Sequence, residues 1–120
     1  MPADIVRWMQ SLFLPAVRSF REPSWSPSAD VYRTPDGWLV KLDLAGVRPE
    51  DIEVAVSGRR LRVRGSRHDW CVGECSHSYL MEIAYSTFER SIELPEDIDR
   101  RRLETEYRDG MLLIRLREAR

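Results

Sequence analysis

The sequence of 120 residues has few cysteines, almost no net charge and no long apolar run. Two cysteines, Cys71 and Cys75, are too few for a disulfide scaffold. Nineteen basic residues nearly balance 20 acidic ones, which argues against nucleic acid or an anionic membrane as main partner. No apolar stretch approaches the roughly 20 residues of a membrane span. The first residues also lack the pattern of a secretory signal, so we expect a cytoplasmic protein.

Motifs of catalysis and cofactor binding are equally scarce. The only histidines are His68 and His77, and the sequence contains no Gly-x-Ser-x-Gly motif of a nucleophile elbow. It also contains no Gly-x₄-Gly-Lys-Ser/Thr loop that would hold a nucleotide phosphate. Its acidic residues alternate with apolar ones, which is typical of the wet face of a sheet. We therefore expect no enzyme, no cofactor and no use of ATP.

Residues 1–27 form a predicted N-terminal arm. Asp4 can cap a short helix over residues 4–14, which Pro15 would end. Apolar residues recur there at helical spacing, namely Ile5, Trp8, Met9, Leu12 and Phe13. The apolar stripe either packs against a core or remains exposed and meets partner chains or unfolded clients. Two prolines and two serines between Arg21 and Pro27 then predict an irregular linker.

Residues 28–118 alternate apolar and polar side chains with period two. Between the turns of this segment we predict short strands over residues 31–33, 38–44, 51–56, 60–64, 79–83 and 88–94. Residues 65–78 break the pattern and predict a long polar loop. Several half-polar strands in succession favour an all-β fold, an antiparallel sandwich with wet outer faces.

The closing segment carries the strongest local signal. Alternating residues 103–107 and the apolar residues 112–116 flank an Asp109-Gly110 pair. A type I′ turn needs positive φ at both central residues, and Asp-Gly tolerates this conformation. The sequence therefore predicts a tight β-hairpin that completes one sheet.

Three patches of the sequence resemble the α-crystallin domain of small heat-shock proteins. They read Leu-Ala-Gly-Val-Arg-Pro-Glu-Asp-Ile (44–52), Phe-Glu-Arg-Ser-Ile-Glu-Leu-Pro (88–95) and Tyr-Arg-Asp-Gly-Met-Leu (107–112). Their order and spacing match the family jointly over about residues 29–116. The resemblance implies an immunoglobulin-like β-sandwich that forms dimers and usually larger homo-oligomers. It also implies a stress-response chaperone that holds unfolding proteins without ATP.

The chain departs from this family pattern at several positions. Ala45 stands where relatives usually have proline, and the last strand ends in Arg117-Glu118. The family's Ile-x-Ile tail, which docks into a neighbour's groove, is missing, because only residues 119–120 follow the predicted domain. We expect another occupant for that groove, such as the arm, a different protein or a client.

Candidate binding residues follow from the strand pattern and from this resemblance. Parity places Arg90 on the apolar side of its strand, where a lone charge needs a partner unless it reaches solvent at an edge. The resemblance places Arg90 at a dimer contact. We predict a dimer interface that contains Arg90, Tyr79, Met81 and Ile83. We predict client or groove binding by Val54, Val56, Leu103, Thr105, Trp8, Leu12 and Phe13.

The polar loop offers weaker candidates for metal binding. His68, Cys71, Cys75 and His77 supply four soft ligands, the number that tetrahedral zinc requires, but at an unusual spacing. An ordinary loop or a redox-sensitive cysteine pair is also compatible with this pattern. Two alternative functions therefore remain beside the chaperone. One is a monomeric co-chaperone-type adaptor, and the other is a thiol- or metal-sensing module.

Overall fold

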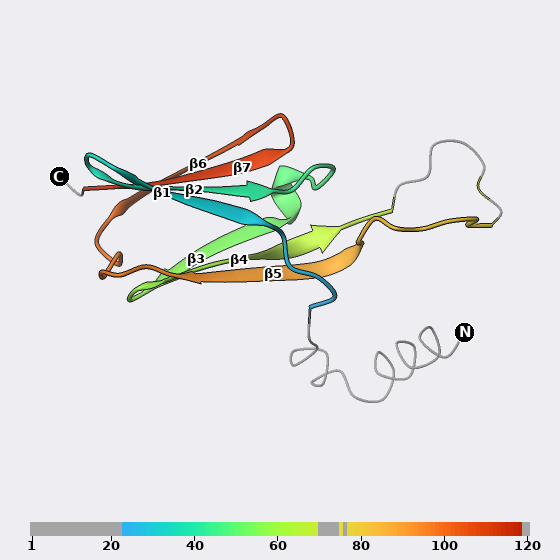
Figure 1. Ribbon diagram of the computed structural model, residues 1–120, viewed down its shortest axis with the longest axis horizontal. Coiled ribbons are helices and arrows are strands. Elements are labelled where there is room, and N and C mark those ends of the chain that lie inside the picture. The colour runs from blue at the N-terminus through green and yellow to red at the C-terminus, as the bar shows by residue number, and fades with distance from the viewer. Residues whose placement is uncertain (1–22, 70–74, 76, 119–120) are drawn as a thin grey trace.

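The computed structural model describes residues 23–69, 75 and 77–118 of the chain (Figure 1). The strands among these residues are β1 (Ala29–Thr34), β2 (Gly37–Asp43), β3 (Ile52–Ser57), β4 (Arg60–Arg67), β5 (Ser86–Glu93), β6 (Arg102–Arg108) and β7 (Met111–Arg117). A single turn of 3-10 helix, η2 (Pro49–Asp51), precedes β3. Within the described part of the chain, no helix is long and apolar enough to cross a membrane.

The strands form two antiparallel sheets that face each other (Figure 1). One sheet has the order β1-β2-β7-β6, and the other has the order β3-β4-β5. All pairings between neighbouring strands are antiparallel. The predicted all-β sandwich is therefore confirmed, whereas the helical part of the N-terminal arm lies outside the described residues.

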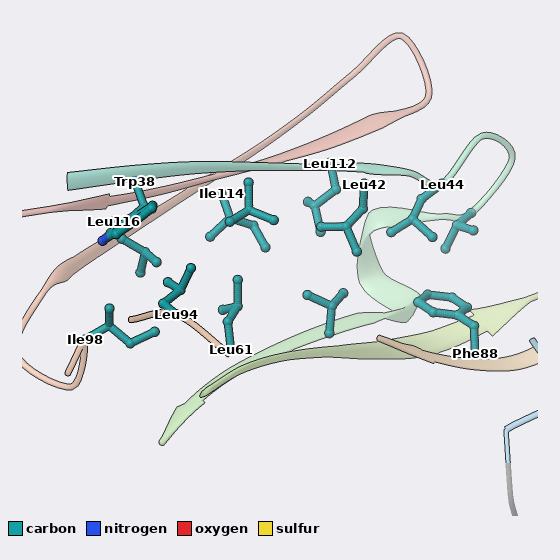
Figure 2. Close-up of a cluster of buried hydrophobic side chains, with 13 residues drawn as sticks. Trp38, Leu42, Leu44, Leu61, Phe88, Leu94, Ile98, Leu112, Ile114 and Leu116 are labelled. Carbon is teal, nitrogen blue, oxygen red and sulfur yellow. The ribbon is translucent and has the colours of Figure 1, made fainter. Parts of the chain in front are cut away.

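The core lies between the sheets because each strand turns alternate side chains inward. On β4, Leu61 and Val63 are fully buried, while Arg60, Arg62 and Arg64 are exposed. Figure 2 shows how labelled side chains of both sheets meet in one apolar layer. The largest fully buried members of this layer are Phe88, Leu42, Leu44, Leu61, Ile98, Ile114 and Leu116. Burying such side chains stabilises the fold by roughly 1.5–3 kcal/mol each.

The hairpin of β6 and β7 forms as predicted. Asp109 has φ 53° and Gly110 has φ 78°, so both central residues of the turn adopt positive φ. Next to this turn, the hydroxyl of Tyr107 donates a hydrogen bond of 2.8 Å to the carbonyl of Leu44. The hairpin is thereby tied to the connection that leads from β2 toward the second sheet.

Two sequence predictions about strands need correction. β4 runs to Arg67, beyond the predicted end at residue 64, because Gly65 continues the pairing opposite Phe88. A Cβ atom at position 65 would lie 2.1 Å from the carbonyl oxygen of Asp51, so the glycine permits a close approach. Residues 79–83, predicted as a strand, form none. A strand needs a partner edge, and these residues pair with no edge among the residues that the structure describes.

One side of the sandwich is closed by the chain entering the first strand. Residues 24–27, here named the strap, run along the edge of β5, where Trp25 forms a parallel bridge with Phe88. The chain then joins the other sheet, because the carbonyl of Ser28 accepts a hydrogen bond from the amide of Asp43. The edges of β5 and β1 therefore lie on the same side. Among the described strands, β3 and β6 are the edge strands on the opposite side, here named the open side.

Candidate functional site

The predicted groove residues among the described residues lie on β3 and β6, the two strands of the open side. Val54 and Val56 on β3 are half-buried and pack against the core from its margin. Leu103 on β6 keeps 40% of its surface exposed, and Thr105 on the same strand is also exposed. Edge strands present unpaired backbone N–H and C=O groups. This side therefore offers apolar side chains beside backbone groups that an extended peptide could pair with.

Ion pairs cover the outer face of β6 and β7 and leave the inner face apolar. Glu104 accepts a hydrogen bond of 2.8 Å from Arg117, and Glu106 accepts one of 3.1 Å from Arg115. The hydrogen bond and charge of Glu104 raise the pKa of Arg117 above its ordinary value. Because these pairs are exposed or half-exposed, they contribute little stability. Their effect on the site is to keep charge on the face away from Leu103.

A second exposed apolar set occupies residues 79–83, here named the apolar loop. Tyr79 is fully exposed, and Leu80, Met81 and Ile83 keep 72%, 53% and 62% of their surfaces exposed. Such a contiguous apolar set on a small domain marks an interaction surface. Three of the four predicted dimer residues lie in this loop. The apolar loop lies in the connection between β4 and β5. The strap runs along β5 of the same sheet.

Arg90, the fourth predicted dimer residue, lies on β5 opposite Val63. Its side chain is half-buried, and Nη1 donates a hydrogen bond of 3.2 Å to the carbonyl of Pro27 in the strap. This contact within the chain supplies the partner that an inward arginine needs. The role of Arg90 between two subunits stays a prediction.

The remaining candidates are dispersed or lie outside the described residues. His68 Nε2 lies 3.6 Å from Asp51 Oδ2, whereas His77 is exposed in the polar loop. Cys75 is disulfide-bonded, and Cys71 lies outside the described residues. Among the residues that can be placed, no group of three or more His, Cys, Asp or Glu side chains could hold a metal. Trp8, Leu12 and Phe13 also fall outside the described part of the chain.

Sequence reasoning missed the junction around Arg67. Its Nε donates to the carbonyl of Ala84 and its Nη1 to the carbonyl of Ala45, both at 2.9 Å. Its guanidinium carbon also lies 4.2 Å from the ring centroid of Trp25. One side chain thus joins the strap, the β2–β3 connection and the exit of the loop. The one sequence signal for this junction was Trp25, a large aromatic residue within a linker of serines and prolines.

These features define an antiparallel β-sandwich with one open side and an exposed apolar loop. A family model described as Hsp20/alpha crystallin family matches residues 30–120. The chain therefore belongs to the Hsp20/alpha crystallin family. This confirms the resemblance that the three sequence patches indicated.

Individual relatives agree with this assignment. The chain is 32% identical over 94 residues to spore protein SP21 of Stigmatella aurantiaca. This alignment covers 78% of the chain and 56% of SP21. Heat shock protein 16.0 of Schizosaccharomyces pombe superposes with a TM-score of 0.69 at 28% identity, covering 78% of this chain and 86% of that one. The hspA protein of Xanthomonas axonopodis superposes with a TM-score of 0.65 at 28% identity, and the match covers 78% of this chain and 94% of hspA. The chain spans 56% and 62% of SP21 and of small heat shock protein C2 of Rickettsia felis, so it matches only part of their lengths.

Proposed function

We propose that this protein is an ATP-independent chaperone that holds unfolding proteins and prevents their aggregation. The observation that carries the proposal is the open side between β3 and β6, where half-buried and exposed apolar side chains lie beside two strand edges that pair with no other described strand. Membership of the Hsp20/alpha crystallin family supports the same function. The protein acts here by binding alone, without catalysis or cofactor, and it works in the cytoplasm.

The open side suits the segments that an unfolding protein exposes. Such segments are apolar and extended, and their backbone groups are unpaired. Leu103 and Val54 provide apolar area, which contributes about 25 cal/mol for each Å² removed from water. The edge of β3 or β6 provides backbone partners irrespective of the client's sequence. Modest, sequence-tolerant affinity follows, as a protein that holds many different clients requires.

Self-association uses the other apolar surface. In this proposal Tyr79, Met81 and Ile83 of one copy contact a second copy, with Arg90 at the same interface. The edge of β1 is a suitable receiver, because Val31 and Tyr32 on it keep 42% and 44% of their surfaces exposed. Contact between the apolar loop of one copy and the β1 edge of the other removes both exposed apolar sets from water. We therefore propose a homodimer, from which larger homo-oligomers can assemble.

Light scattering of a heat-labile protein such as citrate synthase tests the proposal. We expect the purified chain to suppress aggregation at an equimolar ratio, with the same efficiency after apyrase has removed nucleotides. Bovine serum albumin at the same mass concentration is the control for unspecific crowding. Failure to suppress aggregation at equimolar or higher ratio, for several different clients, would refute the chaperone function. Sedimentation velocity on the same sample checks the dimer, since a strict monomer would contradict self-association.

A further inference from the structure

The edge of β5 is occupied by the strap in the manner of an added strand. The amide of Ser24 donates a hydrogen bond of 2.9 Å to the carbonyl of Thr87. The amide of Glu89 in turn donates one of 3.2 Å to the carbonyl of Trp25. This alternation of acceptor and donor along β5 is the pattern of a parallel ladder. The β5 edge is thus competent to bind an extended segment through backbone groups alone.

The side chain of Trp25 contacts Phe88, Arg67 and the carbonyl of Ser86, and this set of groups is here named the Trp25 pocket. The ring of Trp25 lies with its centroid 5.0 Å from that of Phe88, at an interplanar angle of 50°. The guanidinium of Arg67 lies over its face at 4.2 Å, which is within the range of a cation–π contact. The indole Nε1 donates a hydrogen bond of 3.2 Å to the carbonyl of Ser86. Recognition therefore requires an aromatic face and is strengthened by an indole N–H.

The walls of this pocket, Phe88 and Arg67, belong to strands of the sandwich and have contacts besides those with Trp25. Phe88 is a core residue with 1% of its surface exposed. Arg67 is held by its two hydrogen bonds of 2.9 Å to the carbonyls of Ala84 and Ala45. Both wall residues lie on strands of the same sheet, where Phe88 pairs opposite Gly65. We expect the pocket to keep its shape when Trp25 leaves.

The strap is held at Trp25 and Pro27, whereas its serines remain in water. Ser24 and Ser26 are exposed, Trp25 is half-buried and Pro27 is buried. Pro27 has no amide hydrogen, so the ladder cannot continue past it. Among the described residues, the strap's backbone pairing with β5 is limited to Thr87 and Glu89, although the strand continues to Glu93. A longer extended segment would find further edge groups that the strap leaves unused.

We propose that the β5 edge and the Trp25 pocket form a second peptide-binding site, which takes an extended client segment with an aromatic side chain when the strap leaves. The present occupant shows what fits, since it offers one aromatic ring between small polar residues. No other side chain of the strap enters the pocket contacts, which makes the site tolerant of sequence. The proposal rests on the chaperone function, because that function supplies the clients. The strap then acts as an internal competitor that client segments must displace.

Fluorescence anisotropy of a labelled peptide in the presence of the full chain tests this site. The probe is Glu-Pro-Ser-Trp-Ser-Pro-Ser-Ala, the sequence of residues 22–29, and the matched control peptide carries Ala in place of Trp. The Trp25→Ala chain should bind the Trp probe about tenfold or more tightly than the native chain does, because its own strap no longer competes effectively. The Ala peptide should bind neither chain. The double variant Trp25→Ala/Arg67→Gln should bind the Trp probe more weakly than the Trp25→Ala chain does.

A second variant and a second peptide serve as controls for folding and for sequence tolerance. Trp25→Leu fills the pocket partly and preserves the fold better, and it should give the same order of affinities with a smaller gain. An unrelated peptide, Thr-Val-Ser-Trp-Thr-Val-Ser, should also bind the Trp25→Ala chain. Binding of the chain's own sequence alone would overturn the client assignment and identify a second copy's strap as the occupant. No binding of either Trp peptide to either folded variant would overturn the site altogether.

Client protection measured on the same preparations separates the two proposals. If the Trp25→Ala chain suppresses aggregation but binds no Trp peptide, the second site is refuted and the chaperone function stands. If it binds the unrelated peptide but neither it nor the native chain suppresses aggregation, the chaperone function fails. The pocket would then be a peptide site without clients, which contradicts the proposal as stated.

Discussion

Substitution of Gly65 tests how closely the backbone before β3 and the ring of Phe88 on β5 approach the middle strand of their sheet. In Gly65→Ala the new methyl group would lie 2.1 Å from the carbonyl oxygen of Asp51 and 2.8 Å from Cζ of Phe88. Neither neighbour can move cheaply, because one is a backbone atom at η2 and the other is a core ring. Overpacking typically costs about 1–3 kcal/mol, and this contact with rigid neighbours should reach about 3 kcal/mol or more.

Urea unfolding followed by circular dichroism, at one fixed protein concentration, measures this cost. A loss of about 3 kcal/mol should lower the urea midpoint by roughly 1–2 M for a domain of this size. Gly58→Ala is the matched control, because no heavy atom lies within 4 Å of its new Cβ. Its φ of 62° still makes alanine cost about 1 kcal/mol. Equal midpoints for the two variants would refute the close approach at position 65.

Three further substitutions probe other contacts. Tyr107→Phe should lower the free energy of unfolding by about 1 kcal/mol, since it removes the 2.8 Å hydrogen bond to Leu44; an unchanged urea midpoint would contradict this. Arg90→Ala should raise the dimer dissociation constant about tenfold in sedimentation equilibrium, and an unchanged constant would remove Arg90 from the interface. Ile83→Ser, at a side chain with 62% exposure, should weaken the dimer to a similar degree while leaving the urea midpoint of the isolated subunit unchanged. If the Ile83→Ser variant dimerised as strongly as the native chain, the apolar loop would not be part of the dimer interface.

Alternation along the strands was sufficient to predict the sandwich and most of its core. Leu61 and Val63 turn inward and Arg60, Arg62 and Arg64 turn outward, because a strand with one wet face must alternate. The Asp109-Gly110 turn was equally predictable, since few other pairs adopt positive φ at both positions. The three sequence patches then identified the family, which composition and periodicity alone could not have done.

The errors arose where tertiary contacts override local pattern. The predicted strand ended at residue 64, because the alternation stops at Gly65, but β4 continues there and the glycine admits the backbone of Asp51. Residues 79–83 have the composition of a strand but pair with no edge within the described chain. Trp25 carries no periodic signal, because it stands alone among serines and prolines. Its position depends on Arg67 and Phe88, which are distant in the sequence.

In the proposed function, clients bind through the open side between β3 and β6. The most direct measurement compares aggregation suppression by Leu103→Asp with that by Ala55→Asp. Leu103 keeps 40% of its surface exposed on β6, whereas Ala55 is exposed on the outer face of β3. Both changes add one carboxylate, and only the first places it among the apolar residues of the open side. We expect Leu103→Asp to need several-fold more protein for the same protection, with Ala55→Asp equal to the native chain. Equal protection by both variants, with both folded, would contradict the claim.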